Sequence, residues 1–100
     1  MKTYTTEQYN LDAASLKEKY SAVIDNVWAD SELVEVESDA FVREVSQFRV
    51  YFDLEKIEEA TNVDEFDIID CYLDVINNEF VIRAMSDGDT DTITSFLKGI

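Results

Sequence analysis

Hydrophobic residues between positions 63 and 77 follow the period of an α-helix. They stand at the i, i+3, i+7 and i+10 spacing that gathers side chains into one buried stripe. Asn62 and Glu65, three residues apart, match a capping pair at the start of such a helix. The Asn77-Asn78 pair suits its end, because asparagine tolerates the left-handed backbone found there. The sequence therefore predicts a helix over 63–77 whose buried stripe consists of Phe66, Ile69, Leu73 and Ile76.

Three aspartates fall on the neighbouring face of this predicted helix. Asp67, Asp70 and Asp74 would span about 10 Å at a rise of ~1.5 Å per residue, with one carboxylate roughly every 5 Å. That spacing is of the same order as the ~3.4 Å between phosphates along one DNA strand. The row therefore indicates a surface that imitates a polyanion, although it contains no catalytic motif.

The N-terminal part of the chain predicts a helix over 12–28. Its apolar positions recur at helical spacing as far as Trp28. Asp12 could cap this helix, and Thr5 or Thr6 could cap an earlier start. The position of the first turn therefore stays open between these alternatives.

Alternating residues predict strands in the next part of the chain. Two valines alternate with two glutamates over 33–37, which predicts a short, half-exposed strand. The segment 38–47 fits either a second strand or a helix capped by Ser38 or Asp39, and its β-prone residues slightly favour the strand. A cleaner alternation of apolar and polar positions predicts a strand over 48–52.

Turns and capping residues delimit the elements that follow. Asp53 caps a predicted short helix over 54–60. A further strand is predicted over 79–85, and a closing helix over 90–97 begins after a Ser-Asp-Gly turn. Since the chain has no proline, repeat or linker, these elements predict one acidic α+β domain over residues 1–100, with about four helices packed on a small, mostly antiparallel sheet.

Acidic residues dominate the composition. Among 100 residues, 23 are acidic, 8 are basic and none is histidine, which gives a net charge of −15. Residues 30–79 hold sixteen of the acids and three of the bases, and so carry −13 of that charge. The chain is 46% hydrophobic and 12% aromatic, which supplies a packed core and excludes the composition of a disordered segment. Such a charge repels nucleic acid and anionic membranes, and it favours a basic protein surface as the partner.

Three sequence features are candidates for chemical sites. Cys71 is the only cysteine, and with no histidine to activate it we interpret it as a small buried hydrophobe. The alternating aspartates after position 86 match the opening of an EF-hand calcium loop, but Thr92 and Lys98 stand where that loop needs glycine and glutamate. Paired carboxylates such as Glu58 and Glu59 lie on predicted exposed faces, where burial does not separate their pKa values. The sequence therefore predicts no catalytic residue, no metal site and no cofactor, and indicates that the protein is not an enzyme.

The segment 57–63, followed by Ile68 and Leu73, resembles the helix-turn-helix of bacterial DNA-binding repressors. The resemblance covers about twenty residues, with Asn62 where the turn glycine usually stands. Glu58 replaces the small residue that lets the two helices approach, and the second helix carries acids instead of the basic or amide side chains that reach bases. The resemblance implies two adjoining helices and not DNA binding.

Small size, negative charge, an ordered core and the lack of a catalytic motif are together similar to phage anti-restriction and anti-CRISPR DNA mimics, without a shared motif. The resemblance implies an inhibitor whose carboxylates replace phosphates against the arginines and lysines of a basic nucleic-acid-binding protein or complex. An immunity protein that guards against a nuclease toxin would use the same physics. We expect no direct nucleic-acid or membrane partner, and a homodimer is a further option. The predicted partner-binding residues are Glu35, Glu37, Glu55, Glu58, Glu59, Asp64, Asp67, Asp70 and Asp74.

An alternative is an adaptor domain whose apolar surface binds a partner and whose charge serves only solubility. Exposed aromatic residues would mark that surface, with Tyr4, Tyr9, Trp28 and Tyr51 as the first candidates. The N-terminus lacks the ~7–15-residue apolar core of a signal peptide, and no apolar run reaches the ~20 residues that cross a bilayer. Because a lone cysteine also suits a reducing compartment, we expect a cytoplasmic protein.

Overall fold

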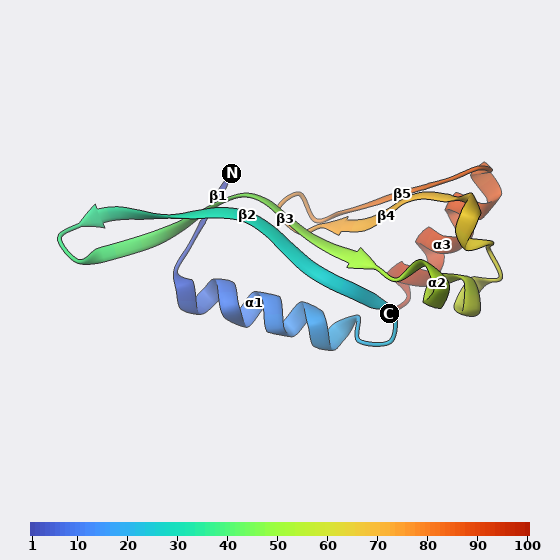
Figure 1. Cartoon of the computed structure of the whole chain (residues 1–100), viewed down its shortest axis with the longest axis horizontal. Helices are drawn as coiled ribbons and strands as arrows, with labels where there is room; N and C mark the ends of the chain where they lie inside the picture. Colours follow the sequence, from blue (N-terminus) through green and yellow to red (C-terminus); the bar gives the residue numbers. More distant parts are fainter.

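The computed structural model describes the whole chain, Met1–Ile100, as three α-helices, one 3-10 turn and five strands (Figure 1). All five strands belong to one sheet, and every pairing in it is antiparallel. In chain order the elements are β1 (Lys2–Tyr4), α1 (Thr6–Lys19), β2 (Ile24–Glu37), β3 (Ala40–Phe52), α2 (Leu54–Thr61), the 3-10 turn η1 (Glu65–Asp67), β4 (Ile68–Asp74), β5 (Glu79–Ala84) and α3 (Asp87–Lys98).

The sheet is built around β3. β2 pairs with one edge of β3 along almost its whole length, from Ile24 opposite Phe52 to Glu37 opposite Ala40. The other edge of β3 pairs with β1 near its middle and with β4 near its end, and β5 completes the sheet beside β4. The long β2–β3 hairpin therefore runs through the molecule, while the other strands support only part of it.

The three helices pack against one face of the sheet and leave the other face open (Figure 1). α1 contributes Ala13 and Leu16 to the core, α2 contributes Ile57, and α3 contributes Ile93 and Leu97. This arrangement is a two-layer α+β fold, in which each helix buries one stripe against the sheet. The buried strand residues are Tyr4, Val45, Phe48, Val50, Phe52, Ile68, Cys71 and Leu73.

The molecule is elongated because the hairpin extends beyond its support. Its principal extents are 53 × 22 × 19 Å, and its radius of gyration of 15.7 Å exceeds the ~13 Å of a typical compact domain of this length. The last pair that β1 makes joins Tyr4 to Arg43, so residues 33–42 continue as a two-stranded projection, which we call the arm. Figure 1 shows the turn of the arm at one end of the long axis and α2 towards the other end.

Several predictions from the sequence are confirmed. The α+β class and the antiparallel sheet are as expected, although the chain forms three α-helices rather than four. Asp53 caps α2 by accepting a hydrogen bond from the Lys56 amide at 3.2 Å. The strand predicted over 79–85 is β5, and the helix predicted over 90–97 is α3, which begins three residues earlier. The segment 38–47 forms a turn and the first part of β3, as the favoured strand alternative requires.

The helix predicted over 63–77 is wrong. After the turn η1, the segment Ile68–Asp74 forms strand β4. β4 contains a bulge at Ile69, which interrupts the alternation of inward and outward side chains. The interrupted alternation gives the apolar residues an apparent helical spacing. β-branched and aromatic residues such as Ile68 and Tyr72 favour the strand instead.

The two adjoining helices implied by the helix-turn-helix resemblance are also not formed. Asn62 has a φ of 64°, and its amide donates to the Glu58 carbonyl at 2.8 Å, so this residue ends α2 instead of starting a second helix. Asn78, with a φ of 50°, adopts the left-handed conformation in the turn between β4 and β5, and not at a helix end. The chain therefore passes from α2 through η1 directly into the sheet.

The N-terminal helix is displaced relative to the predicted range 12–28. Thr5 caps α1 by accepting a hydrogen bond from the Gln8 amide at 3.1 Å, so the helix begins at the earlier of the expected positions. It ends well before residues 24–28, which belong to β2 together with the predicted strand 33–37. No glycine or proline marks this boundary, and apolar residues on either side of it fit both periods.

Candidate functional site

Most of the predicted partner-binding acids lie where α2 meets η1. We call this region the acidic end, and its only basic residue is Lys56. Figure 1 shows α2 far from the turn of the arm along the long axis. The acidic end therefore forms a separate concentration of charge. Its seven acids are Asp53, Glu55, Glu58, Glu59, Asp64, Glu65 and Asp67.

Besides Asp53, which caps α2, two further carboxylates of the acidic end hold its backbone in place. Glu58 Oε2 accepts a hydrogen bond from the Glu65 amide at 2.7 Å, and Asp64 Oδ1 accepts one from the Phe66 amide at 2.9 Å. Both bonds satisfy amides at the start of a short turn, where backbone partners are lacking. The two exposed glutamates of α2 take no part in such bonds, so their charges are available to a partner.

Desolvation and crowded negative charge perturb the pKa of Glu65. Desolvation, followed by the charge of neighbouring carboxylates, raises the pKa of Glu65 above the ordinary value for a glutamate. The carboxylates that act on it are those of Glu55, Glu58, Asp64 and Asp53. These acids therefore share one region of the surface and repel one another, a repulsion that the cations of a partner would relieve.

The acidic end is accompanied by three large exposed apolar side chains. Phe66 is 88% exposed, and Ile69 and Met85 are each more than half exposed. The Met85 amide donates to the Asp67 carbonyl at 2.9 Å, which joins the two chain segments. The prediction that Phe66 and Ile69 belong to a buried stripe is therefore wrong, because the strand turns Ile68 inward instead. Strand alternation with a bulge is the sequence signal that would have placed Ile69 on the surface.

The aspartates predicted to form one row on a helical face are distributed differently. Asp67 ends the turn η1, whereas Asp70 and Asp74 alternate outward along β4, away from the buried side. Asp70 Oδ2 forms an ion pair with Arg83 at 2.9 Å. Asp74 lies opposite Arg49 in the pairing of β3 with β4. The continuous row is therefore wrong, because two of its three aspartates lie in a strand beside arginines.

The remaining predicted residues, Glu35 and Glu37, lie on the arm. Glu35 pairs with Phe41 and Glu37 pairs with Ala40 across the hairpin, and both glutamates are exposed. With Asp39 in the turn, the arm carries three acids and no base. The structure therefore divides the predicted site residues among three places in a molecule that is 53 Å long: the acidic end, strand β4 and the arm (Figure 1).

Nearly all the acids are free of ion pairs within the protein. No charged residue is buried, and the one ion pair joins Asp70 to Arg83. Fifteen net negative charges along 53 Å correspond to one charge per about 3.5 Å, close to the ~3.4 Å per phosphate along one DNA strand. The molecule therefore carries the linear charge density of a single nucleic-acid strand on an ordered scaffold.

The aromatic residues considered for an apolar binding surface fall into two groups. Tyr4 is buried, and the ring of Tyr9 packs beside it with a centroid distance of 6.1 Å. Trp28 and Tyr51 lie instead on the open side of the sheet, beside Arg49. The Arg49 guanidinium donates to Tyr51 Oη at 3.0 Å. This side of the sheet therefore combines aromatic rings with a cation and differs in character from the acidic end.

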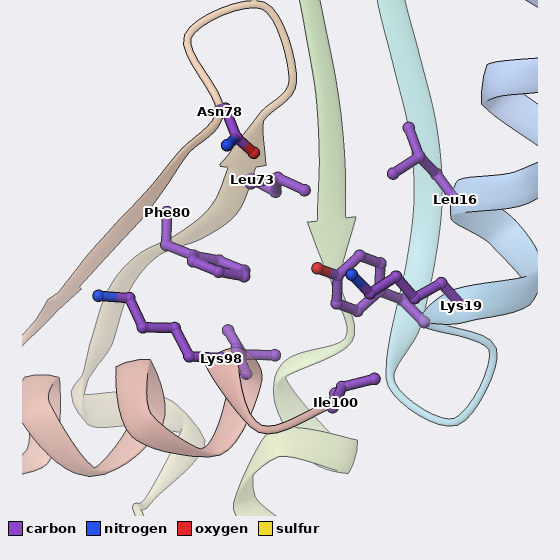
Figure 2. A pocket seen from close by; sticks show the side chains of 9 residues that line it. Leu16, Lys19, Leu73, Asn78, Phe80, Lys98 and Ile100 are labelled. Carbon is purple, nitrogen blue, oxygen red and sulfur yellow. The ribbon is translucent and has the colours of Figure 1, made fainter.

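An apolar hollow lies between the C-terminal ends of α1 and α3 (Figure 2). Its volume is about 220 Å³, below the ~300–1,000 Å³ of typical ligand pockets. Figure 2 shows Leu73 and Phe80 across the hollow from Lys19 and Ile100. The ammonium of Lys19 already lies over the ring of Tyr20, 5.4 Å from its centroid. Because the hollow is small and Lys19 already contacts Tyr20, the hollow gives no basis for a small-molecule site.

The remaining candidates for chemical sites, Cys71 and the aspartates after position 86, have structural roles. Cys71 is buried in β4, and burial raises the pKa of its thiol to about 12. Asp87 and Asp89 occupy the first turn of α3, where Ser86 Oγ accepts a hydrogen bond from the Asp89 amide at 3.1 Å. Negative charge stabilises that end of a helix. No group of three acids or cysteines converges on a position where it could hold a metal ion.

Comparison with known proteins identifies no relative of this chain. No protein-family model matches the chain, and no curated protein or solved structure matches it. None of the helices is both long and apolar enough to span a lipid bilayer.

Proposed function

We propose that this protein is an acidic inhibitor that occupies the basic nucleic-acid-binding surface of a target protein or complex. The observation that carries the proposal is the density of unpaired carboxylates along an ordered, elongated molecule. One net charge per about 3.5 Å is close to the ~3.4 Å per phosphate of one DNA strand. A folded scaffold presents these charges without the ordering cost that a flexible acidic chain would incur on binding.

The acidic end is the contact to which we assign the phosphate-like role. Desolvation and, after it, the charge of neighbouring carboxylates raise the pKa of Glu65, and arginine and lysine side chains of a target would replace the repulsion among these carboxylates by attraction. Phe66 would add an exposed aromatic anchor to this contact. Long-range attraction would accelerate association, and added salt would weaken binding.

An immunity protein that blocks a nuclease toxin would use the same contact, because the nucleic-acid site of a toxin also binds phosphates. A second candidate function is that of an adaptor domain, which the exposed side chains of Phe66, Ile69 and Met85 favour. In an adaptor, apolar contacts would supply the affinity and the charge would serve solubility. The inhibitor and the adaptor therefore differ in their response to salt and to DNA.

Retention on purified targets distinguishes these candidates. The immobilised proteins would be a restriction enzyme, a guide-loaded CRISPR effector and a nuclease toxin, each measured at low and at high salt. An inhibitor of nucleic-acid-binding sites is retained at low salt, released at high salt and displaced by duplex DNA. Retention that neither salt nor duplex DNA changes would contradict the proposal and favour the adaptor.

Charge reversal locates the contact. The triple variant Glu55→Lys, Glu59→Lys and Glu65→Lys reverses three charges and changes the net charge from −15 to −9, while the side-chain hydrogen bonds that hold the turn remain. We expect it to weaken binding at least about tenfold, which is ~1.4 kcal/mol. An equal loss in a control with the same net charge would show that total charge, and not the acidic end, determines binding. The control reverses three exposed acids of α1 and α3, namely Glu7, Glu18 and Asp91.

A further inference from the structure

One face of β3 continues past the part that the helices cover. Val45 and Phe48 are both buried on this face, because the irregular pairing between them keeps their side chains on the same side. Two residues further towards the arm is Arg43, whose guanidinium lies over the ring of Tyr9 of α1 at 5.1 Å. The next residue on the same face is Phe41, which belongs to the arm.

Phe41 and Leu33 form the exposed continuation of this core-facing side. Leu33 pairs with Arg43 and Phe41 pairs with Glu35, so Leu33 and Phe41 are diagonal neighbours on one face. Each is 54% exposed, whereas Val45 on the same face is fully buried. Figure 1 shows that α1 begins near β1 and does not reach the turn of the arm. The arm therefore has an apolar face that no other element of the chain covers.

Acidic residues surround this apolar face. Glu35 shares the face with Phe41, and Glu37 and Asp39 lie at the end of the arm. Because the arm has no basic residue, a second copy docked against it would bring like charges together. Nucleic acid and anionic lipid would be repelled for the same reason. The charge therefore selects an occupant that combines apolar surface with positive charge.

We propose that the arm is a docking element that inserts into an apolar groove on a basic protein surface. Leu33 and Phe41 would fill the groove, and the carboxylates of the arm would pair with arginines and lysines at its rim. From Leu33 to Glu37 the arm extends about 14 Å, at ~3.4 Å per residue, which suits insertion better than a flat contact. This contact is separate from the acidic end and gives the molecule a second attachment point. The docking proposal rests on the proposed function in one respect only, namely that the partner has a basic surface.

Two synthetic helical peptides test the arm directly. One is amphipathic and consists of leucine and lysine, and the other has glutamine in place of every leucine, so the two carry the same charge. The wild-type protein should bind the leucine peptide at least about tenfold more tightly, with amide chemical-shift changes in the arm. Equal affinity for the two peptides, or shift changes confined to other elements, would overturn the proposal.

A double variant and a matched control separate the arm from other exposed apolar side chains. Leu33→Ser with Phe41→Ser should abolish the roughly tenfold preference for the leucine peptide and preserve the lysine-dependent binding. The control, Phe66→Ser with Met85→Ser, removes side chains that are even more exposed and should retain the preference. If the control loses the preference and the arm variant keeps it, the docking face is not on the arm.

Sedimentation at high salt tests a second copy as the occupant. High salt screens the repulsion between two arms, so a face made for self-association would give a dimer that the arm variant abolishes. That result would overturn the proposal, whereas a monomer under the same conditions supports it. The proposed inhibitor function is tested by a different experiment, displacement by duplex DNA, which does not involve these peptides. The failure of either proposal can therefore be distinguished from the failure of the other.

Discussion

Two phenylalanines in opposite environments give the sharpest test of the fold. Phe48 is fully buried, whereas Phe66 is 88% exposed. In Phe48→Ala, a cavity replaces a ring that packs against Tyr4 and Tyr9, with centroid distances of 6.0 and 5.3 Å. The cavity and the lost aromatic contacts should lower the free energy of unfolding by ~3–5 kcal/mol.

That loss is large compared with the ~5–15 kcal/mol by which a domain is normally stable. At roughly 4–8 °C per kcal/mol for a domain of this size, the midpoint of thermal unfolding of Phe48→Ala should fall by at least about 12 °C. Phe66→Ala removes the same atoms from the surface, so its free energy of unfolding should change by less than about 0.5 kcal/mol.

Urea unfolding followed by far-ultraviolet circular dichroism measures both variants. The helix that the hydrophobic spacing predicts over 63–77 would bury Phe66. If that helix formed, Phe66→Ala would lower the free energy of unfolding by a large amount. A loss above ~2 kcal/mol for Phe66→Ala would refute the assignment of this segment to a turn and a strand. A loss below ~1 kcal/mol for Phe48→Ala would refute the packing of β3 beneath α1.

Two titratable side chains give further predictions. The raised pKa of Glu65 means that the folded protein binds a proton more tightly than the unfolded chain, so the free energy of unfolding should fall as the pH rises above the ordinary glutamate pKa of 4.5. In urea unfolding across that range, Glu65→Gln should flatten this dependence on pH and Glu59→Gln should not; equal flattening in both variants would contradict the assignment of the dependence to Glu65. Because burial raises the pKa of Cys71 to about 12, the native thiol should react with dithiobis(nitrobenzoate) far more slowly than the urea-unfolded thiol, and equal rates would contradict its burial.

Helices α2 and α3 begin with capping residues and are predicted well from the sequence, whereas α1 is misplaced although Thr5 caps it. Asp53 starts α2 and Ser86 starts α3, and each side chain accepts an amide hydrogen bond that a helix start otherwise leaves unsatisfied. β4 is mispredicted because the bulge at Ile69 replaces the period of two with a spacing that a helix also satisfies. The boundary between α1 and β2 is misplaced for a related reason, since no glycine or proline separates apolar positions that suit either period.

The acidity of the candidate site can be predicted from composition, but its distribution in space cannot. Glu55 and Glu58 lie together because both belong to one short helix, a relation that sequence spacing describes. The distance of Glu35 from them depends on the register of β2 against β3, which joins residues that are far apart along the chain. The exposure of Phe41 likewise follows from where β1 ends and α1 begins, and neither limit is visible in the sequence around Phe41.

Displacement of labelled duplex DNA from a purified nucleic-acid-binding target tests the central claim most directly. If carboxylates replace phosphates on the target, the fluorescence anisotropy of the DNA should fall as this protein is added at low salt. The triple variant Glu55→Lys, Glu59→Lys and Glu65→Lys should then displace the DNA at least about tenfold less efficiently. Anisotropy that stays constant or rises while the protein binds the same target would show that DNA and protein occupy separate surfaces, and would contradict the proposed function.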